Sequence, residues 1–464
     1  MEFIGRQHEL ALLTRELELV RNGGSRPGRC LMLRGRRRVG KSRLVEVFAE
    51  RSGFPSVFFT ASGAAPALEL HEFHREVLGS DLPGRELFEG VALQSWEGAL
   101  RLLASALPQD RPSIVILDEL PYLASSDPGF EGMLQRVWDR VLARRPVLLL
   151  LVGSNLSMMA ALNEYGLPFH QRGTPMLLQA LSPAEVGDML DLGAAQAIDS
   201  YLVTGGLPLI CADWTPGMSR HEFLRSSLAA PTSALVVSAE LALAAEFPAE
   251  AQPRTVLSAI GSGERTFTAV LRATGLPAAS LNRALDLLAR KQIVATDRPL
   301  STRPSRETRY RVADPYLRFW LYFLGPRVSE IDRGRGDRVL ARIEQGWGSW
   351  RGRAVEPVIR EGLRRLTDSP AVGGYWTRSN DVEVDLVGAD RDAVAGHIDF
   401  VGSIKWHDER GFDSHDLADL LRGRDRVPGA DAETPLIAVS RAGIDVDGLA
   451  RCYDPAGLIE AWRH

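Results

Sequence analysis

The chain contains very little lysine. Of the 55 basic residues among its 464 amino acids, only Lys41, Lys291 and Lys405 are lysines, and all the others are arginines. A position that merely needs positive charge is therefore expected to carry arginine here, whereas a lysine indicates that a compact ammonium group is required. Lys41 follows a glycine in an arginine-rich segment, and Lys405 ends an apolar one, so both are candidates for functional residues.

Cysteine is also scarce, and long apolar runs are missing. Cys30, Cys211 and Cys452 are scattered, odd in number and without metal-ligand spacing, which excludes a disulfide framework and favours buried thiols in a reducing compartment. The start of the chain lacks the basic and apolar parts of a signal peptide. The longest apolar run, "PVLLLLVG", is too short to cross a bilayer. These absences predict a cytoplasmic protein without a membrane span.

The bulk composition is that of a multidomain globular protein. A hydrophobic content of 45% and a charged content of 25% are ordinary values, and the length predicts about two to four domains. A net charge of −4 gives no general attraction to nucleic acid. Any contact with nucleic acid must therefore come from a local basic patch.

The strongest motif is a glycine-rich loop between an apolar strand, "CLMLRG", and an amphipathic helix, "SRLVEVFAERSG". It fits the pattern G-x-x-x-x-G-K-[ST], in which backbone N–H groups cradle phosphate oxygens. The lysine of such a loop reaches the β- and γ-phosphates, and its hydroxyl residue ligates Mg²⁺. We therefore predict that ATP and Mg²⁺ bind at Gly35, Arg36, Arg37, Arg38, Val39, Gly40, Lys41, Ser42 and Arg43.

Two further buried strands end in polar residues. "SIVIL" leads into Asp118 and Glu119, and we expect Asp118 to hold a magnesium-bound water while Glu119 polarises the attacking water as general base. The alternative is an acidic pair that caps a helix. The strand "PVLLLLVG" leads into Ser154 and Asn155, where a polar side chain could sense the γ-phosphate, although strand ends are often polar in any case.

Six segments in order resemble the archaeal-type ATPases, which are AAA+/STAND-like P-loop proteins: "FIGRQHELALL", "GRRRVGKS", "ILDELPYLA", "LLVGSNLSMM", "HQRGTPMLLQALSPAEV" and "YLVTGGLPL". The resemblance covers residues 1–330. It implies that Gly5 and Arg6 lie near the adenine and that Gly206 and Pro208 lie in a lid that touches the nucleotide. Arg172 resembles the arginine before the last core strand, which could stabilise transition-state charge; its alternative role is a surface ion pair.

The middle of the chain is predicted to be helical and locally basic. Small-residue helices over 199–243 indicate a lid, and three short amphipathic helices followed by a charged strand pair resemble a winged helix, with "AASLNRALDLLARKQ" in the recognition position. Residues 290–342 carry 13 basic and 6 acidic side chains, a balance that favours contact with DNA phosphates. The alternative is that this module only packs against the lid. The aromatic run "DPYLRFWLYFLGP" is interpreted as core rather than as a base-stacking platform.

The last third of the chain resembles a PD-(D/E)XK restriction-endonuclease-like domain. Glu356 lies on a predicted helix, Asp385 near the end of a strand, and Lys405 at the end of the next strand. The resemblance is to the domain often fused behind archaeal-type ATPases, whose pattern closes with Glu-x-Lys-Trp. Here Ser403 occupies the glutamate position, and a hydroxyl is a poor replacement for a carboxylate around a hard cation.

In an active domain of that kind, the two carboxylates bind the metal and the lysine orients water or steadies the developing charge. Asp399 or Glu383 could supply a relocated carboxylate. We expect instead a degenerate site, in which Lys405 pairs with Asp385 beside Ser403 and cleavage activity is lost.

The sequence thus predicts a multidomain α/β protein. The expected parts are a P-loop ATPase core over 1–195, a helical lid over 196–250, a winged helix over 251–315, a helical connector over 316–350 and a nuclease-like α/β domain over 351–464. The hypothesis is an ATP-hydrolysing switch that moves the winged helix and the tail, with DNA and further copies of the chain as candidate partners. The alternatives are an ATP-gated, metal-dependent DNA nuclease and a transcription-regulator-like binding module controlled by ATP.

Overall fold

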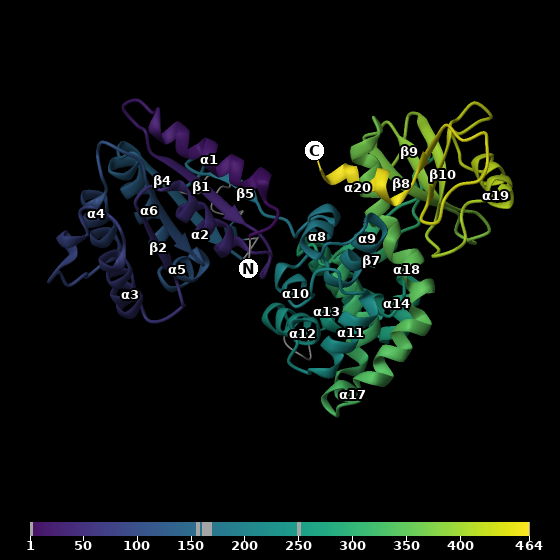
Figure 1. Ribbon diagram of the computed structural model, residues 1–464, viewed down its shortest axis with the longest axis horizontal. Helices are drawn as coiled ribbons and strands as arrows, with labels where there is room; N and C mark the ends of the chain where they lie inside the picture. The colour runs from purple at the N-terminus through teal and green to yellow at the C-terminus, as the bar shows by residue number, and fades with distance from the viewer. Residues whose placement is uncertain (1–2, 155–157, 160–168, 248–251, 464) are drawn as a thin grey trace. The chain divides into compact units, whose positions relative to one another are not determined.

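The computed structural model describes residues 3–154, 158–159, 169–247 and 252–463 (Figure 1). The chain divides into two compact units, Met1–Ala180 and Leu181–His464. Each unit has its own sheet, and the predicted multidomain α/β architecture is confirmed. The boundary between the two units lies between Ala180 and Leu181. The ATPase core was predicted to end later, at residue 195.

The first unit is built on a parallel sheet of five strands in the order β2-β3-β4-β1-β5. Every residue of β3 and β4 is buried, as expected for central strands that are covered on both faces. Since parallel strands all end at the same edge, this topology brings the residues after β1, β3 and β4 together. The strands are β1 (Arg29–Arg34), β2 (Ser56–Thr60), β3 (Ser113–Asp118), β4 (Val147–Gly153) and β5 (Thr174–Leu177).

The helices of the first unit pack around this sheet (Figure 1). Their core contains an aromatic cluster in which Phe59, Phe73, Phe88, Trp96 and Phe130 make tilted and edge-to-face contacts, and all five side chains are buried. The elements are α1 (Gln7–Arg21), α2 (Lys41–Ser52), α3 (Pro66–Gly79), η1 (Arg85–Phe88), α4 (Trp96–Ala106), α5 (Leu120–Ser126), α6 (Phe130–Arg140) and η2 (Leu142–Arg144).

The second unit begins with helices that have clear start signals. Ser182 and Ser219 each form a capping box, in which the serine hydroxyl and a glutamate three residues later satisfy helix N–H groups reciprocally. The helices are α8 (Pro183–Leu190), α9 (Ala194–Thr204), α10 (Pro208–Ala212), α11 (Arg220–Ala229) and α12 (Ala234–Glu246). Within the described ranges, no single helix has the length and apolarity to span a membrane; one bent pair, 220–229 with 234–244, passes on those two criteria alone.

The residues expected to form a winged helix form three helices and an antiparallel strand pair. They are α13 (Gln252–Gly261), α14 (Phe267–Thr274), α15 (Ala278–Arg290), β6 (Val294–Asp297) and β7 (Arg309–Val312). The aromatic run that follows is mostly core, because Tyr316, Phe319, Trp320 and Phe323 are buried while Tyr322 is partly exposed. This confirms the interpretation of the run as core.

The connector and the tail share one long helix. After α16 (Pro315–Phe319), η3 (Trp320–Leu324), η4 (Gly325–Arg327) and α17 (Val328–Asp332), helix α18 runs without a break over Gly336–Leu366. The expected domain boundary at residue 350 therefore lies inside a helix. Pro357 interrupts the hydrogen bonding of α18, since proline has no N–H for the carbonyl four residues earlier. That carbonyl, on Arg353, accepts a hydrogen bond of 3.1 Å from the Arg318 guanidinium.

The tail contains a mixed sheet in the order β12-β11-β10-β9-β8. The central strand β10 is antiparallel to β9 and parallel to β11. The elements are β8 (Ala371–Trp376), β9 (Glu383–Ala389), β10 (Ile398–Lys405), α19 (Ser414–Arg424), β11 (Leu436–Ser440), β12 (Arg451–Tyr453), α20 (Pro455–Ile459) and η5 (Glu460–Trp462).

Candidate functional site

The glycine-rich loop connects β1 to α2 at the carboxyl edge of the parallel sheet. A side chain at Gly35 would place its Cβ 2.6 Å from the Leu178 carbonyl oxygen, so only glycine fits there. Gly40 has φ 89° and directly precedes α2, a conformation that favours glycine. The first N–H groups of α2 thus face the loop, and an anion is stabilised at such a helix end.

Lys41 lies buried at the start of α2 with its ammonium group over the loop. Its Nζ donates to the carbonyl oxygens of Gly35 and Arg36, each at 3.0 Å. Burial lowers the pKa of Lys41, and the carboxylates of Glu119 and Asp118 oppose that shift. The ammonium group is therefore hydrogen-bonded to two carbonyl oxygens, and phosphate oxygens could replace these carbonyls as its acceptors.

Ser42 and Asp118 meet at one point. The Ser42 hydroxyl donates to Asp118 Oδ2 at 2.6 Å, although the two residues come from α2 and β3. Asp118 is buried, and desolvation raises the pKa of this carboxyl group against the opposing effect of the Ser42 hydrogen bond. A hydroxyl and a buried carboxylate are hard oxygen donors, and a divalent cation beside them would offset the cost of the buried charge. This donor pair fits Mg²⁺, with phosphate and water oxygens completing the shell.

Glu119 adopts a strained backbone conformation next to this pair. Its φ of 50° lies in the left-handed region, which is costly for a residue other than glycine and concentrates at functional sites. The Ser154 hydroxyl, at the end of β4, donates to Glu119 Oε2 at 2.9 Å. The structure therefore brings together the two residues predicted as general base and phosphate sensor, while Asn155 lies outside the described residues.

Arg6 contributes to the site in a way that the sequence did not reveal. Its guanidinium donates to the carbonyl oxygens of Val39, at 3.0 Å, and Gln179, at 2.8 Å, and it pairs with Glu9 at 3.1 Å. The residue is almost fully buried and, like Gly5, has a positive φ. Arg6 thus fixes the backbone of the glycine-rich loop, and the position near the adenine that the resemblance implied stays a prediction.

Glu69 is a second residue that sequence reasoning missed. It is 1% exposed on α3, and its Oε1 accepts from Ser62 N, Ser62 Oγ and Ala64 N at 2.8–2.9 Å. These bonds hold the loop after β2, whose last residue pairs with Asp118 in the sheet register. No local motif marks a glutamate in the first turn of a helix as such an anchor.

Several other predicted residues have structural partners. Arg172 forms a fork with Asp139, with Nε 3.0 Å from both carboxylate oxygens, which is the surface ion pair weighed as its alternative role. Arg43 pairs with Glu46 on the outer side of α2. Gly206 and Pro208 lie in the second unit, where a side chain at Gly206 would clash with the Leu181 carbonyl oxygen and Pro208 begins α10.

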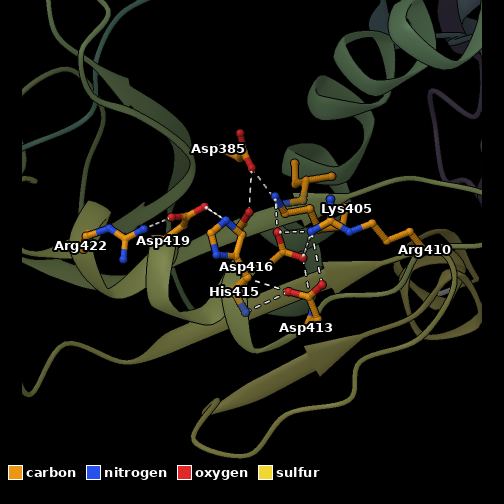
Figure 2. A network of polar contacts seen from close by, with 10 residues as sticks. Asp385, Lys405, Arg410, Asp413, His415, Asp416, Asp419 and Arg422 are labelled. Atoms are coloured by element: carbon orange, nitrogen blue, oxygen red, sulfur yellow. Dashed lines mark hydrogen bonds and ion pairs between the residues drawn. The ribbon is translucent and has the colours of Figure 1, made fainter.

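In the tail, the structure corrects the predicted partner of Lys405. Its Nζ pairs with Asp416 Oδ1 at 2.8 Å, not with Asp385 (Figure 2). Asp385 Oδ2 already accepts from the Ser403 hydroxyl at 3.0 Å and from Ile404 N at 2.9 Å. Asp416 is 2% exposed in the first turn of α19, and a carboxylate buried so deeply requires cationic partners. Lys405, together with Arg410, meets that requirement.

The other tail carboxylates are also engaged. Glu356 pairs with Arg360 at 3.1 Å; burial raises the pKa of Glu356, and the guanidinium opposes that shift. Glu383 bonds to Arg309 at 2.5 Å and Asp399 accepts from the Ser369 hydroxyl at 2.7 Å, so neither has moved beside Asp385 as a free carboxylate. Nowhere in the described part of the chain do three or more His, Cys, Asp or Glu residues gather as a metal site.

Comparisons with known proteins find one family that matches part of the chain and one archaeal protein that is similar over most of its length. Residues 320–416 match the family DUF234, "Archaea bacterial proteins of unknown function", and this segment includes Lys405 and Asp416. An uncharacterized protein of Methanocaldococcus jannaschii is 23% identical over 457 residues, covering 92% of this chain and 93% of that protein. The similarity to the Methanocaldococcus jannaschii protein thus extends over almost the whole chain.

Two solved structures are similar to part of this chain at low identity. A Walker-type ATPase of Pyrococcus abyssi is 16% identical with a TM-score of 0.48, covering 69% of this chain and 96% of that one. The ORC2 protein of Aeropyrum pernix is 17% identical with a TM-score of 0.44, covering 72% and 95%.

The pairing of Lys405 can be tested by a double-mutant cycle. Lys405→Met and Asp416→Asn are expected to show a coupling free energy of about 0.5–3 kcal/mol, since their side chains are in direct contact. Lys405→Met and Asp385→Asn should show a smaller coupling, because Lys405 pairs with Asp416 while Asp385 accepts from Ser403 and Ile404. Denaturant unfolding of the two cycles checks this. A larger coupling to Asp385 than to Asp416 would contradict the observed pairing.

Proposed function

We propose that the first unit binds ATP with Mg²⁺ and hydrolyses it. The observation that carries this proposal is the convergence of Lys41, the Ser42–Asp118 pair and the Glu119–Ser154 pair at one edge of the sheet. The lysine and the two pairs supply a phosphate-binding cation, oxygen ligands for a metal, and a base for water. These are the parts that phosphoryl transfer to water requires.

Each residue has a definite task in this reaction. Lys41 leaves its two carbonyl acceptors and binds the β- and γ-phosphate oxygens, where its charge stabilises the transition state. Ser42 and Asp118 would hold Mg²⁺, whose charge would offset that of the phosphates. Glu119 orients the attacking water and accepts its proton.

Ser154 links phosphate binding to the base. Its hydroxyl donates to Glu119 in the structure described here, and a hydrogen bond to a carboxylate weakens that carboxylate as a base. A γ-phosphate offers Ser154 a more strongly charged acceptor. If the hydroxyl turns to the phosphate, Glu119 becomes available to water only when ATP is bound.

We further propose that the nucleotide state acts as a switch on the second unit, which would contain the lid, the winged helix and the nuclease-like tail. The support is that the lid helix α9 and the tail are tied together: Asp199 bonds to Arg351 of α18, to Trp406 and to Arg441. A displacement of α9 would therefore be passed on to the tail. The alternative is a binding module that changes conformation when ATP binds. Unlike the proposed switch, such a module would not hydrolyse ATP.

The winged helix and the basic stretch are proposed to contact DNA phosphates. Part of the positive charge of 290–342 is used internally, since Arg309 and Arg311 pair with Glu383 and Asp297. Arginines in the loop that joins β6 to β7 remain exposed, namely Arg298, Arg303 and Arg306. An exposed basic loop beside a three-helix module is suited to the sugar–phosphate backbone rather than to base edges.

We also propose that the tail does not cut DNA efficiently. Ser403 supplies a hydroxyl where a carboxylate is needed, and its partner Asp385 is occupied by two donors. Lys405 is bound by Asp416, which removes the ammonium from the position of a catalytic lysine. The competing function, an ATP-gated nuclease, would require all of these contacts to rearrange around a metal.

The ATPase assignment predicts different effects for two substitutions. Lys41→Ala should weaken ATP binding, whereas Glu119→Gln should keep binding and lower turnover by about 10²–10⁴-fold, the usual contribution of a general base. ATP affinity and phosphate release check this, with Lys291→Ala as a matched control at a half-buried lysine of the second unit. Hydrolysis by Glu119→Gln at the parent rate would show that another group is the base.

The DNA proposal predicts a steep salt dependence. Replacing Arg298, Arg303 and Arg306 by serine should weaken nonspecific binding and lower the slope of log affinity against log salt by up to about 0.9 for each lost phosphate contact. Fluorescence anisotropy with a short duplex measures both quantities. Replacing Arg365, Arg422 and Arg463 by serine removes the same charge at exposed positions outside this loop and should leave the slope unchanged. Absence of binding by the parent even at low salt would leave only the lid-packing role.

The nuclease proposal predicts no appreciable cleavage of plasmid or single-stranded DNA by the parent protein in Mg²⁺ or Mn²⁺. If the Ser403→Glu variant cleaves DNA, the parent protein is inactive because it lacks a carboxylate at position 403. Agarose gels with Lys405→Ala as a companion variant provide the measurement. Robust cutting by the parent that Lys405→Ala abolishes would refute the claim of lost activity.

A further inference from the structure

The second unit contains a cavity of about 300 Å³ that the proposed ATPase chemistry does not use. Segments distant in sequence line it: α9, the start of α11, α18, and the tail loops after β10 and β11. Three arginines stand in its wall, Arg220, Arg351 and Arg441. Leu192, Met218 and Trp347 add apolar surface.

The three arginines are fixed by ion pairs. Asp199 pairs with Arg351 at 2.9 Å and with Arg441 at 3.1 Å, and Asp408 pairs with the same two arginines at 2.9 Å each. Arg220 pairs with Glu344 at 2.8 Å and stacks over the Trp347 ring at 4.2 Å. Three guanidinium groups thus face three carboxylates, and the charges of the wall are balanced.

Hydrogen bonding in this wall is nevertheless incomplete. Arg351 Nε, Arg441 Nε and Arg220 NH1 are buried, and no other described residue accepts a hydrogen bond from them. The Arg351 side chain is only 3% exposed. Leaving a buried donor without an acceptor is costly, and it is unusual for three to gather around one cavity. An acceptor that the chain itself does not supply would satisfy them.

We propose that this cavity is a binding site for a small, singly charged oxyanion, a carboxylate or a phosphate diester with a short apolar part. Oxygen lone pairs satisfy the guanidinium N–H groups, and charge-assisted bonds of this kind are strong. The balanced wall selects for low charge, because a polyanion would be repelled by Asp199 and Asp408. The apolar part would lie against Trp347, Leu192 and Met218.

A ligand in this position stabilises the second unit. It would connect α9, α11, α18 and the tail, the elements on which the switch would depend, so its binding energy is added to the folded state. The site is made entirely by residues of the second unit and does not involve the phosphate-binding loop. The inference therefore stands whether or not the chain hydrolyses ATP.

The test is calorimetric titration of the full chain at constant ionic strength with two probes, benzoate and dimethyl phosphate. The parent is expected to bind at least one of them with one-to-one stoichiometry, and the stronger probe identifies the oxyanion class. Arg441→Lys keeps the cation but removes the Nε–H donor, and it should weaken binding about tenfold or more. Arg424→Lys, at a similarly buried arginine that does not line the cavity, should leave it unchanged.

Two further variants make the outcome decisive. Arg220→Lys removes the unpartnered NH1 from the opposite part of the wall and should also weaken binding, which keeps the test open if Arg441→Lys folds poorly. Lys41→Ala should have no effect. Failure of the parent to bind either probe at millimolar concentrations would show that only water fills the cavity. Binding lost in Lys41→Ala and retained in both arginine variants would place the anion in the phosphate-binding loop and overturn the proposal.

Discussion

The buried ion pair between Arg351 and Asp199 is the interaction on which the second unit depends. Arg351 lies in the middle of α18, and Asp199 lies on α9, 152 residues earlier in the chain. Burial alone would lower the pKa of Arg351, but its bonds to Asp408 and Asp199 raise it, so the guanidinium stays charged. Because Asp199 also accepts from Trp406 and Arg441, removing Arg351 would leave a buried carboxylate short of donors, a defect that typically costs about 3–5 kcal/mol. Asp199 thereby ties α9 to α18 and to the segments that follow β10 and β11.

The strand and helix on either side of the glycine-rich loop, and the strand that ends at Asp118, could be predicted because their patterns are local. Glycines, a lysine and a serine at fixed spacing between a strand and a helix specify a loop without reference to the rest of the chain. Arg6 and Glu69 could not be predicted in the same way. Arg6 bonds to backbone carbonyls of residues that are distant in sequence, and Glu69 bonds to backbone N–H groups whose positions depend on the conformation of one loop. Many other polar side chains could make such bonds, so no sequence pattern marks these two residues. The partner of Lys405 was predicted incorrectly for a related reason: the burial of Asp416 depends on how α19 packs, which the sequence pattern does not show.

The connector illustrates a different limit of sequence reasoning. The sequence was predicted to change from connector to tail at residue 350, yet α18 continues for 31 residues through both regions. Apolar residues at helical spacing on both sides, such as Val339, Ile343, Val355 and Ile359, bury one continuous stripe. Packing of that stripe overrides the local helix-breaking tendency. The order of elements in the tail was nevertheless anticipated, since strands of buried residues are recognisable one at a time.

The hydrogen bond from Arg318 to the Arg353 carbonyl has an evolutionary consequence. Pro357 leaves that carbonyl without its helical donor, and Arg318 replaces it from outside the helix. With any other residue at position 357, the helix would satisfy the carbonyl by itself and the arginine would lose this task. Selection on position 318 is thus conditional on proline at position 357. Substitutions at these two positions should be correlated among descendants of a common ancestor, and the proline should be the later of the two to arise.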